Sequence, residues 1–236
     1  MSNEKRLSKA MAAAGIASRR ACEKLIFAGL VKVNGKTALL PQTMVDWERD
    51  SIIVDGKAVK GEEIKKYYML NKPCGYVCSN KQGNSTKIVS NLFKDEGSRL
   101  FTVGRLDKET SGLIIVTNDG HFANKVIHPS NGVEKEYLAK TNKEITAEHL
   151  KLISGGAIVE GAFVQPKSVT KVRKGTLKVV VSDGKKHEVR ILLENAGLEV
   201  RELSRIRIGG LHLSSLARGQ WKAMTIQEQE LVTGCA

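Results

Sequence analysis

Apolar residues in the first 60 positions recur at helical spacing over two stretches, residues 7–14 and 19–28. Gly15 and Gly29 follow these stretches and can end a helix in the left-handed conformation. Ser18 can cap the start of the second stretch with its hydroxyl. The pattern therefore predicts two short helices near the start of the chain.

Two short apolar runs, residues 30–33 and 51–54, follow the predicted helices. Each ends directly in a two-residue turn signal, Asn-Gly at 34–35 and Asp-Gly at 55–56. Such dipeptides between short strands favour tight hairpins because both residues tolerate a positive φ. We therefore expect two small hairpins beside the two helices.

The polar segment KGEEIKK, residues 60–66, separates this region from a strand-rich one. We expect a first domain over 1–60, a linker over 61–66 and a second domain over 67–236. The elements expected in the second domain are strands at 67–73, 113–116, 135–141 and 200–213, helices at 120–127 and 147–153, and a strand, a turn and a helix within 176–197. Strands joined mostly by turns predict an α+β fold on an antiparallel or mixed sheet. The lack of regular βαβ alternation and of a GxGxxG motif argues against a Rossmann fold.

The charge balance indicates a polyanionic partner. Lys and Arg number 38 against 25 Asp and Glu, which gives a formal net charge of +13. Residues 1–36 hold eight basic and two acidic residues, and residues 167–222 hold thirteen and five. Two separate basic segments favour two contact surfaces for a nucleic acid. A basic membrane-binding helix fits less well, because only 5% of the residues are aromatic.

Several other classes of protein are disfavoured by the sequence. No stretch approaches the roughly 18 apolar residues of a membrane helix, and the first 15 residues are too polar for a signal peptide. We therefore expect a cytoplasmic protein with no membrane partner. The cysteines, Cys22, Cys74, Cys78 and Cys235, contain one close pair, too few for a zinc site, so we expect reduced thiols and no metal.

The segment SRRACEKLIFAGLVKVNGK, residues 18–36, resembles the small αL RNA-binding module found in a small-subunit ribosomal protein (number four) and in several RNA-modifying enzymes. The resemblance implies that Arg19, Arg20 and Lys24, on the wet side of the second helix, bind RNA. Cations on one helix face suit an RNA backbone. The alternative is an ordinary solvated helix face.

Three segments of the second domain contain residue types suited to chemistry on a nucleic acid. GRLDKETSGL holds Arg105 and Asp107, KEY holds Lys135 and Tyr137, and HEVRILLENAG holds Arg190 at a helix start. Each has an ordinary structural explanation on its own. A loop aspartate often caps a turn, a strand tyrosine often packs in the core, and an arginine on a helix is usually a surface residue.

The ordered set MLNKPxGYVCS, VGRLDxxTSGLxxxTNDG, KEY, HExRxLLExxG and RIRIGxLxLxxLxxGxW resembles bacterial ribosomal RNA pseudouridine synthases of the RsuA/RluB group. It covers nearly the whole chain, and GRLDxxTSGL is its most specific part. The chain departs from the usual pattern at Glu188, where many relatives carry Gln, and at Ile191, where many carry Arg or Lys.

The resemblance implies the reaction. Such enzymes detach a uracil from its ribose, rotate the base and rejoin it through carbon 5, without a cofactor or a metal. Asp107 would be the catalytic aspartate, as nucleophile on carbon 1′ or as base at carbon 2′. Arg190 would pair with Asp107 and keep it ionised, since an adjacent cation favours a charged carboxylate.

The resemblance also implies contacts to the RNA. Tyr137 would stack on the flipped target base, and Arg105 would fill the gap that the base leaves. Lys72 and Lys135 are further expected RNA contacts. Leu192 or Leu193 would form an apolar wall near the base, although core packing would explain both.

Two other functions compete with this one. A non-catalytic RNA-binding or ribosome-assembly protein would have no need of an acid facing phosphate. A glycoside hydrolase would need two carboxylates, and no second acid stands in a comparable motif, because Asp119 and Asp183 lie in turn-like contexts. We expect a monomer that modifies ribosomal RNA or a ribosomal subunit precursor. The segments 18–35 and 184–194 slightly favour the large-subunit branch of the family.

Overall fold

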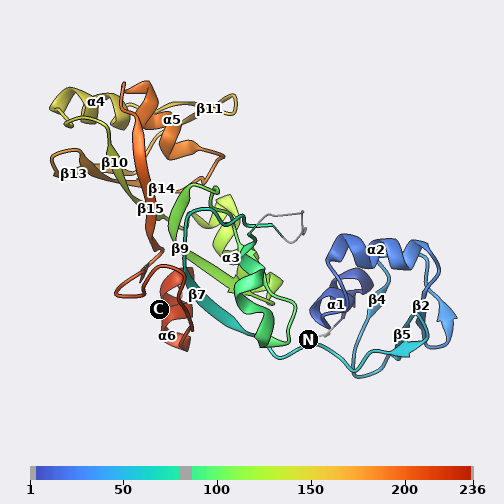
Figure 1. Cartoon of the computed structure of the whole chain (residues 1–236). Helices are drawn as coiled ribbons and strands as arrows, with labels where there is room; N and C mark the ends of the chain where they lie inside the picture. The colour runs from blue at the N-terminus through green and yellow to red at the C-terminus, as the bar shows by residue number, and fades with distance from the viewer. Residues whose placement is uncertain (1–3, 80–86, 235–236) are drawn as a thin grey trace. The chain divides into compact units, whose positions relative to one another are not determined.

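The computed structural model of the chain describes residues 4–79 and 87–234 and has two compact units (Figure 1). The first unit contains the chain up to Lys66 together with residues 95–100 and 118–120. The second unit contains the remaining residues. Residues 61–66, at the end of the first unit, have neither helix nor strand. In the described parts of the chain, no helix has the length and apolar character needed to cross a bilayer.

The first unit packs two helices on two small hairpins. Its helices are α1 (Leu7–Ala13) and α2 (Arg19–Phe27), and the Ser18 hydroxyl accepts the Ala21 N–H at the start of α2, as predicted. The strands are β1 (Lys5–Arg6), β2 (Val31–Val33), β3 (Lys36–Thr37), β4 (Met44–Val45), β5 (Ile52–Val54) and β6 (Lys57–Ala58). The four-stranded sheet has the order β3-β2-β5-β6.

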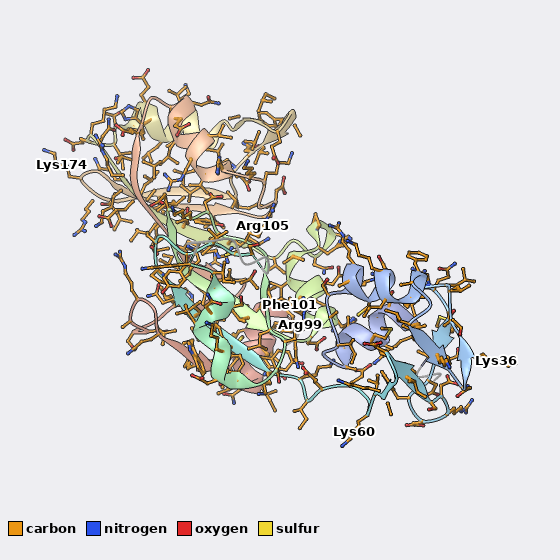
Figure 2. The ribbon with its side chains drawn as sticks, turned by 45° about the vertical axis from the view of Figure 1, so that its right-hand side comes forward. Lys36, Lys60, Arg99, Phe101, Arg105 and Lys174 are labelled. Atoms are coloured by element: carbon orange, nitrogen blue, oxygen red, sulfur yellow. The ribbon has the colours of Figure 1, made fainter. Side chains whose placement is uncertain are left out.

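Both predicted hairpin turns of the first unit are present. Asn34 and Gly35 have φ values of 51° and 79°, and Asp55 and Gly56 have 48° and 75°. Each pair joins antiparallel strands in register, and Lys36 begins the strand after the first turn, at the edge of the unit in Figure 2. The apolar faces of the helices and strands, from Leu7 to Val54, form one buried core.

The second unit is built on a nine-stranded sheet with the order β13-β14-β10-β15-β9-β7-β17, to which β16 and β8 add pairs at β15 and β9. The strands are β7 (Tyr67–Lys72), β8 (Phe101–Val103), β9 (Thr110–Thr117), β10 (Lys135–Thr141), β13 (Ser168–Arg173), β14 (Thr176–Val181), β15 (Val200–Ile208), β16 (Leu211–His212) and β17 (Trp221–Ala223). Among these named strands β15 runs parallel to β9, and the other pairs are antiparallel. The sheet is therefore mixed, and the predicted α+β class is confirmed.

Helices cover both faces of this sheet. They are η1 (Val89–Glu96), α3 (Gly120–Ile127), η2 (Pro129–Asn131), α4 (Ala147–Ser154), α5 (Glu188–Asn195) and α6 (Ile226–Thr233), and a hairpin of β11 (Ala157–Val159) and β12 (Ala162–Val164) lies beside α5. Helix α3 lies along β7 and β9 (Figure 1) and packs Phe122 against Met69 and Leu113. On the other side of β7, Tyr68 forms an aromatic cluster with Phe93 and Trp221. Burial on both faces explains why β9 has an unbroken apolar run.

One expected strand, residues 200–213, is interrupted. It forms β15 and β16, which turn back on each other at Gly209. Gly209 has φ +55°, and a Cβ there would lie 2.6 Å from the Val232 carbonyl oxygen. The α6 backbone therefore approaches this turn closely, which the residues around 209 could not reveal.

An ion network around the buried Glu136 carboxylate links three strands on one face of the sheet. The Glu136 carboxylate accepts hydrogen bonds from Arg207 at 2.8 Å and pairs with Lys178 at 3.1 Å, so it joins β10 to β15 and β14. Arg207 also donates to the Gly209 carbonyl at 2.6 Å. Burial alone would raise the pKa of Glu136, but the hydrogen bonds from Arg207 and Lys178 lower it below the ordinary glutamate value.

We predict that Glu136→Gln lowers the free energy of unfolding of the second unit by about 1–3 kcal/mol at neutral pH, because two charge-assisted hydrogen bonds are weakened. Since the folded pKa is lowered, the stabilisation is complete above about pH 5 and is lost as the pH falls through the folded pKa. Urea unfolding followed by Trp221 fluorescence, in a Trp47→Phe background, measures both effects.

The control is Glu202→Gln, the same change at an exposed carboxylate that pairs with Lys140 at 2.9 Å. We expect it to cost about 0–1 kcal/mol, as exposed ion pairs do. Equal losses in the two variants, or the same pH dependence in wild type and Glu136→Gln, would contradict the role given to the network.

Candidate active site

Asp107 lies in a short loop, residues 104–109, between β8 and β9. The loop is closed by a hydrogen bond from the Thr110 N–H to the Asp107 carbonyl at 3.1 Å. It is tied to the segment after β7 by two further bonds, from the Gly75 N–H to the Lys108 carbonyl at 2.8 Å and from the Leu106 N–H to the Cys78 sulfur at 3.4 Å. The position of Asp107 is thus fixed by backbone contacts, while its side chain stays 38% exposed.

Lys72 lies beneath this loop, and its predicted role in RNA binding is wrong. The side chain is completely buried, and its ammonium donates to the carbonyls of Pro73, Tyr76 and Lys108 at 3.1, 2.8 and 3.4 Å. Burial lowers its pKa. An RNA phosphate has no access to this group, which instead joins the loop after β7 to the Asp107 loop.

A cavity of about 620 Å³ opens next to the Asp107 loop. It brings together four of the residues predicted from sequence: Asp107, Arg105, Tyr137 and Lys135. Arg105 is exposed, and Figure 2 labels it on the loop that follows Phe101, the first residue of β8. These residues come from two segments about 30 positions apart in the sequence, and the pairing of strands in the sheet brings the two segments together.

Tyr137 and Lys135 reach the cavity from β10, two residues apart and therefore on the same face of the strand. Tyr137 is 9% exposed. The Lys135 ammonium donates to the Ser182 carbonyl at 2.8 Å. Burial, followed by the nearby positive charge of Arg205, lowers the pKa of Lys135.

The expected ion pair between Arg190 and Asp107 does not form. Arg190 points to backbone carbonyls, those of Glu109 at 3.4 Å and Val200 at 3.5 Å. The group beside Asp107 is the His187 imidazole, whose Nε2 lies 3.4 Å from Oδ1. His187 is the residue before α5 and has a left-handed backbone with φ 56°, and Arg190 is the third residue of that helix. The Arg190 guanidinium therefore contacts the Asp107 loop at a backbone carbonyl, that of Glu109, and not at the Asp107 carboxylate.

The expected apolar wall of Leu192 or Leu193 is not part of the cavity lining. Leu192 and Leu193 are buried in the core, and the apolar part of the lining comes from other side chains: Val77, Ile127, Val181, Val189 and Leu203. Asp107 is also accompanied by further acids, since Asp183 and the buried Glu188 line the same cavity. Asp183 stands in a turn-like Ser-Asp-Gly context, whereas Glu188 lies in the motif HExRxLLExxG, at the position where many relatives carry Gln.

Several polar residues of the cavity were not predicted as site residues, among them His187, Glu188 and Arg205. Arg205 is 4% exposed, and its Nε donates to the Leu113 carbonyl at 2.8 Å. The alternation of residues along β15 could have indicated that Arg205 is buried, because Arg205 lies two positions after Leu203 and so faces the same side of the strand. A charged residue at a buried strand position needs a specific partner or function.

The cavity has an excess of basic residues. Its cations are Arg105, Lys108, Lys135, Lys185, Lys186 and Arg205, against three acids. In the first unit, Arg19, Arg20 and Lys24 are exposed on α2, and Arg19 lies 3.6 Å from Glu23. Among the residues that the structure describes, no group of three or more acidic, His or Cys side chains is arranged to hold a metal ion.

The mixed sheet, with a carboxylate at a basic cavity and a separate basic module before it, defines an enzyme that acts on nucleic acid. Residues 66–195 match the profile of RNA pseudouridylate synthases, and residues 5–52 match the S4 domain. The chain belongs to the RNA pseudouridylate synthase family, whose members are isomerases.

Curated relatives align with most of the length of the chain. It is 35% identical to ribosomal large subunit pseudouridine synthase B of Bacillus subtilis over 94% of the chain and 93% of that protein. It is 33% identical to the dual-specificity RNA pseudouridine synthase RluF of Escherichia coli, over 94% of the chain and 76% of that protein. A chloroplast relative from Arabidopsis thaliana is 46% identical over 96% of the chain, which spans 59% of that longer protein. A crystal structure of a pseudouridylate synthase matches with a TM-score of 0.69 and 27% identity, over 96% of the chain and 99% of that structure.

We predict that Lys72→Met lowers the free energy of unfolding of the second unit by about 2–5 kcal/mol, because three carbonyls lose their buried donor. The slope of log K against log salt for RNA binding should stay unchanged, because no phosphate contact is removed. Urea unfolding and binding titrations at several salt concentrations measure the two quantities.

Lys174→Met is the control for this change. Lys174 lies at the turn between β13 and β14 and extends outward in Figure 2, with 82% of its side chain exposed. We expect it to leave stability within about 0.5 kcal/mol of wild type. A stable Lys72→Met protein with a reduced salt slope would restore Lys72 as an RNA contact.

Proposed function

We propose that this synthase converts a specific uridine of ribosomal RNA to pseudouridine, with Asp107 as the catalytic carboxylate. The observation that carries the proposal is the position of Asp107, at the edge of a basic cavity of about 620 Å³ with Tyr137 inside it. A carboxylate repels phosphate, so a protein that only binds RNA gains nothing from it there. The ribosomal RNA substrate is supported by the names of the relatives from Bacillus subtilis and Escherichia coli.

Each side chain at the cavity has a proposed task. Asp107 acts at the sugar of the target uridine, as nucleophile on carbon 1′ or as base at carbon 2′. The target base leaves its stack at a cost of a few kcal/mol, and Tyr137 stacks on it. Arg105, exposed at the rim, fills the gap in the RNA. Arg190 acts as a positioning residue through the Glu109 carbonyl.

Contacts to the phosphates are proposed both at the cavity and on the first unit. Lys135 and the other lysines around the cavity face the backbone of the target strand, and Arg19, Arg20 and Lys24 bind a second part of the RNA. Large-subunit RNA is the favoured substrate, in keeping with the name of the Bacillus subtilis relative, which is 35% identical to the chain.

We predict that Asp107→Asn reduces pseudouridine formation by about 10³-fold or more, because the substitution removes the group that acts on the sugar. RNA affinity should be kept or slightly raised, because a charge that repels phosphate is gone. Pseudouridine is mapped in ribosomal RNA from cells that lack the gene, before and after incubation with each purified variant.

Asp183→Asn is the matched control, since Asp183 is an exposed carboxylate at the rim of the same cavity. It should keep most of the activity. Turnover by Asp107→Asn would remove Asp107 from the mechanism, and an absence of new pseudouridine with the wild-type protein would contradict the proposed substrate.

A second prediction concerns the first unit. Replacing Arg19, Arg20 and Lys24 together by Gln should weaken RNA binding and reduce the magnitude of the salt slope by about 2, because up to three phosphate contacts are lost. The control variant replaces Lys32, Lys36 and Lys57, which are exposed on the strands of the same unit, so the change in net charge is identical. Equal effects of the two triple variants would show that net charge, and no particular surface, is responsible.

A further inference from the structure

The cavity holds an unusual concentration of unpaired polar atoms. In the described parts of the chain, five buried side-chain atoms have no hydrogen-bond partner, and three belong to residues that line this cavity: Thr110 Oγ1, Glu188 Oε1 and Arg205 Nη2. Each buried polar group without a partner costs about 1–3 kcal/mol, and such groups are rare in folded proteins. Their gathering at one cavity indicates that a ligand supplies the missing partners.

Arg205 is held in one position. On β15 it is paired in register with Tyr137 on β10, so both side chains project from the same face. Its Nε donates to the Leu113 carbonyl at 2.8 Å, which fixes the plane of the guanidinium. On the neighbouring strand, a Cβ at Gly112 would collide with the Arg205 carbonyl oxygen, so the glycine allows this close approach. The guanidinium therefore presents Nη2 as a rigid, buried donor.

Glu188 is equally constrained. It is the first residue of α5 and 4% exposed. Its Oε2 accepts the Lys185 N–H at 3.0 Å, while Oε1 has no partner. Burial raises the pKa of this carboxyl, and the backbone N–H groups of Gly184 and Lys185, followed by the nearby Lys135 ammonium, offset the effect in part. The protein thus supplies incomplete compensation for the charge, and an N–H donor on a ligand would complete it.

A free donor and a free acceptor match the edge of one RNA base. Uracil presents its N3–H between two carbonyl oxygens, so a carboxylate can accept the first and a guanidinium can donate to a neighbour. Cytosine presents a lone pair at N3 and an amino group at C4. The acceptor N3 would then face the carboxylate, which is also an acceptor, and the amino donor would face the guanidinium, which is also a donor. A site built to bond one pattern rejects the other strongly, because its buried groups stay unpaired.

We infer that Glu188 and Arg205 read the edge of the target uracil, with Glu188 Oε1 accepting the N3–H and Arg205 Nη2 donating to a flanking carbonyl oxygen. The inference rests on the proposed function and names the residues that select uridine over cytidine. It adds no covalent step, and it makes both residues specificity determinants beside Asp107.

The geometry of the reaction fits this pair. Exchanging N1 for C5 as the atom bonded to the sugar is equivalent to turning the ring by a half-turn about its N3–C6 line. The N3–H stays in place during this turn, and the two carbonyl oxygens exchange positions. Glu188 and Arg205 can therefore hold the uracil before and after the rearrangement with the same two hydrogen bonds.

Binding of nucleotides to the full chain tests the inference without relying on turnover. Dissociation constants for uridine 5′-monophosphate, its N3-methyl derivative and cytidine 5′-monophosphate are measured by NMR titration with the wild type and with Glu188→Met. We expect wild type to bind uridine monophosphate at least about tenfold more tightly than either analogue. Glu188→Met should lose most of this difference, whereas the control Asp183→Asn should keep it.

The role of Arg205 is also tested by changing the ligand. An Arg205 variant is prone to misfolding, because it loses the hydrogen bond from Nε to the Leu113 carbonyl. The 4-thio derivative of uridine monophosphate is a weaker acceptor and should bind wild type less tightly than the parent nucleotide. Arg205→Gln, if folded by its thermal midpoint, should bind both equally. The 2-thio derivative is measured in the same way. If wild type binds both thio derivatives as tightly as uridine monophosphate, Arg205 is excluded as the donor to either carbonyl.

The outcomes separate this inference from the proposed function. Equal penalties for N3-methylation in wild type and Glu188→Met, or no binding of uridine monophosphate at millimolar concentration, would overturn the inference even if ribosomal RNA is modified. Conversely, discrimination that depends on Glu188, without pseudouridine formation in ribosomal RNA, would support the base contacts and reject the proposed substrate.

Discussion

The cavity depends on one buried ammonium. Lys72 ends β7, and its three hydrogen bonds to the carbonyls of Pro73, Tyr76 and Lys108 hold two loops together. An isolated buried charge would be very costly, so the loops must adopt the conformation that surrounds it with oxygen atoms. Asp107 precedes Lys108, so its place is set by this packing and leaves its carboxylate available to a substrate.

The strand pair β10–β15 connects the site to the stability of the sheet. One face carries the ion pair Glu136–Arg207, and the other presents Tyr137 and Arg205 to the cavity. The register shifts between Glu136 and Tyr137, and such irregularities re-aim side chains next to functional sites. The ion pair Glu136–Arg207 thus stabilises the same strand pair whose register brings an aromatic ring and a guanidinium together on the other face.

Local patterns in the sequence were enough for most elements of the fold. The turn dipeptides at 34–35 and 55–56, the capped helix α2 and the helices α3 and α4 depend on residues within a few positions of each other, and all are present. The interruption after β15 was not foreseeable, because its cause is the α6 backbone beside Gly209. The first unit likewise includes two short segments, 95–100 and 118–120, that are distant in sequence from the rest of it.

The sequence by itself determined the family resemblance, the basic character and the loop that carries Asp107, because motif, charge and turn chemistry are properties of neighbouring residues. Only the tertiary structure decided which charged groups are buried and which meet. It placed Lys72 under the loop, turned Arg190 to backbone carbonyls and set His187 beside Asp107. The physical reason is that burial and side-chain direction arise from strand pairing across many intervening residues, and a charge in a sequence gives no sign of the partners that the fold will supply.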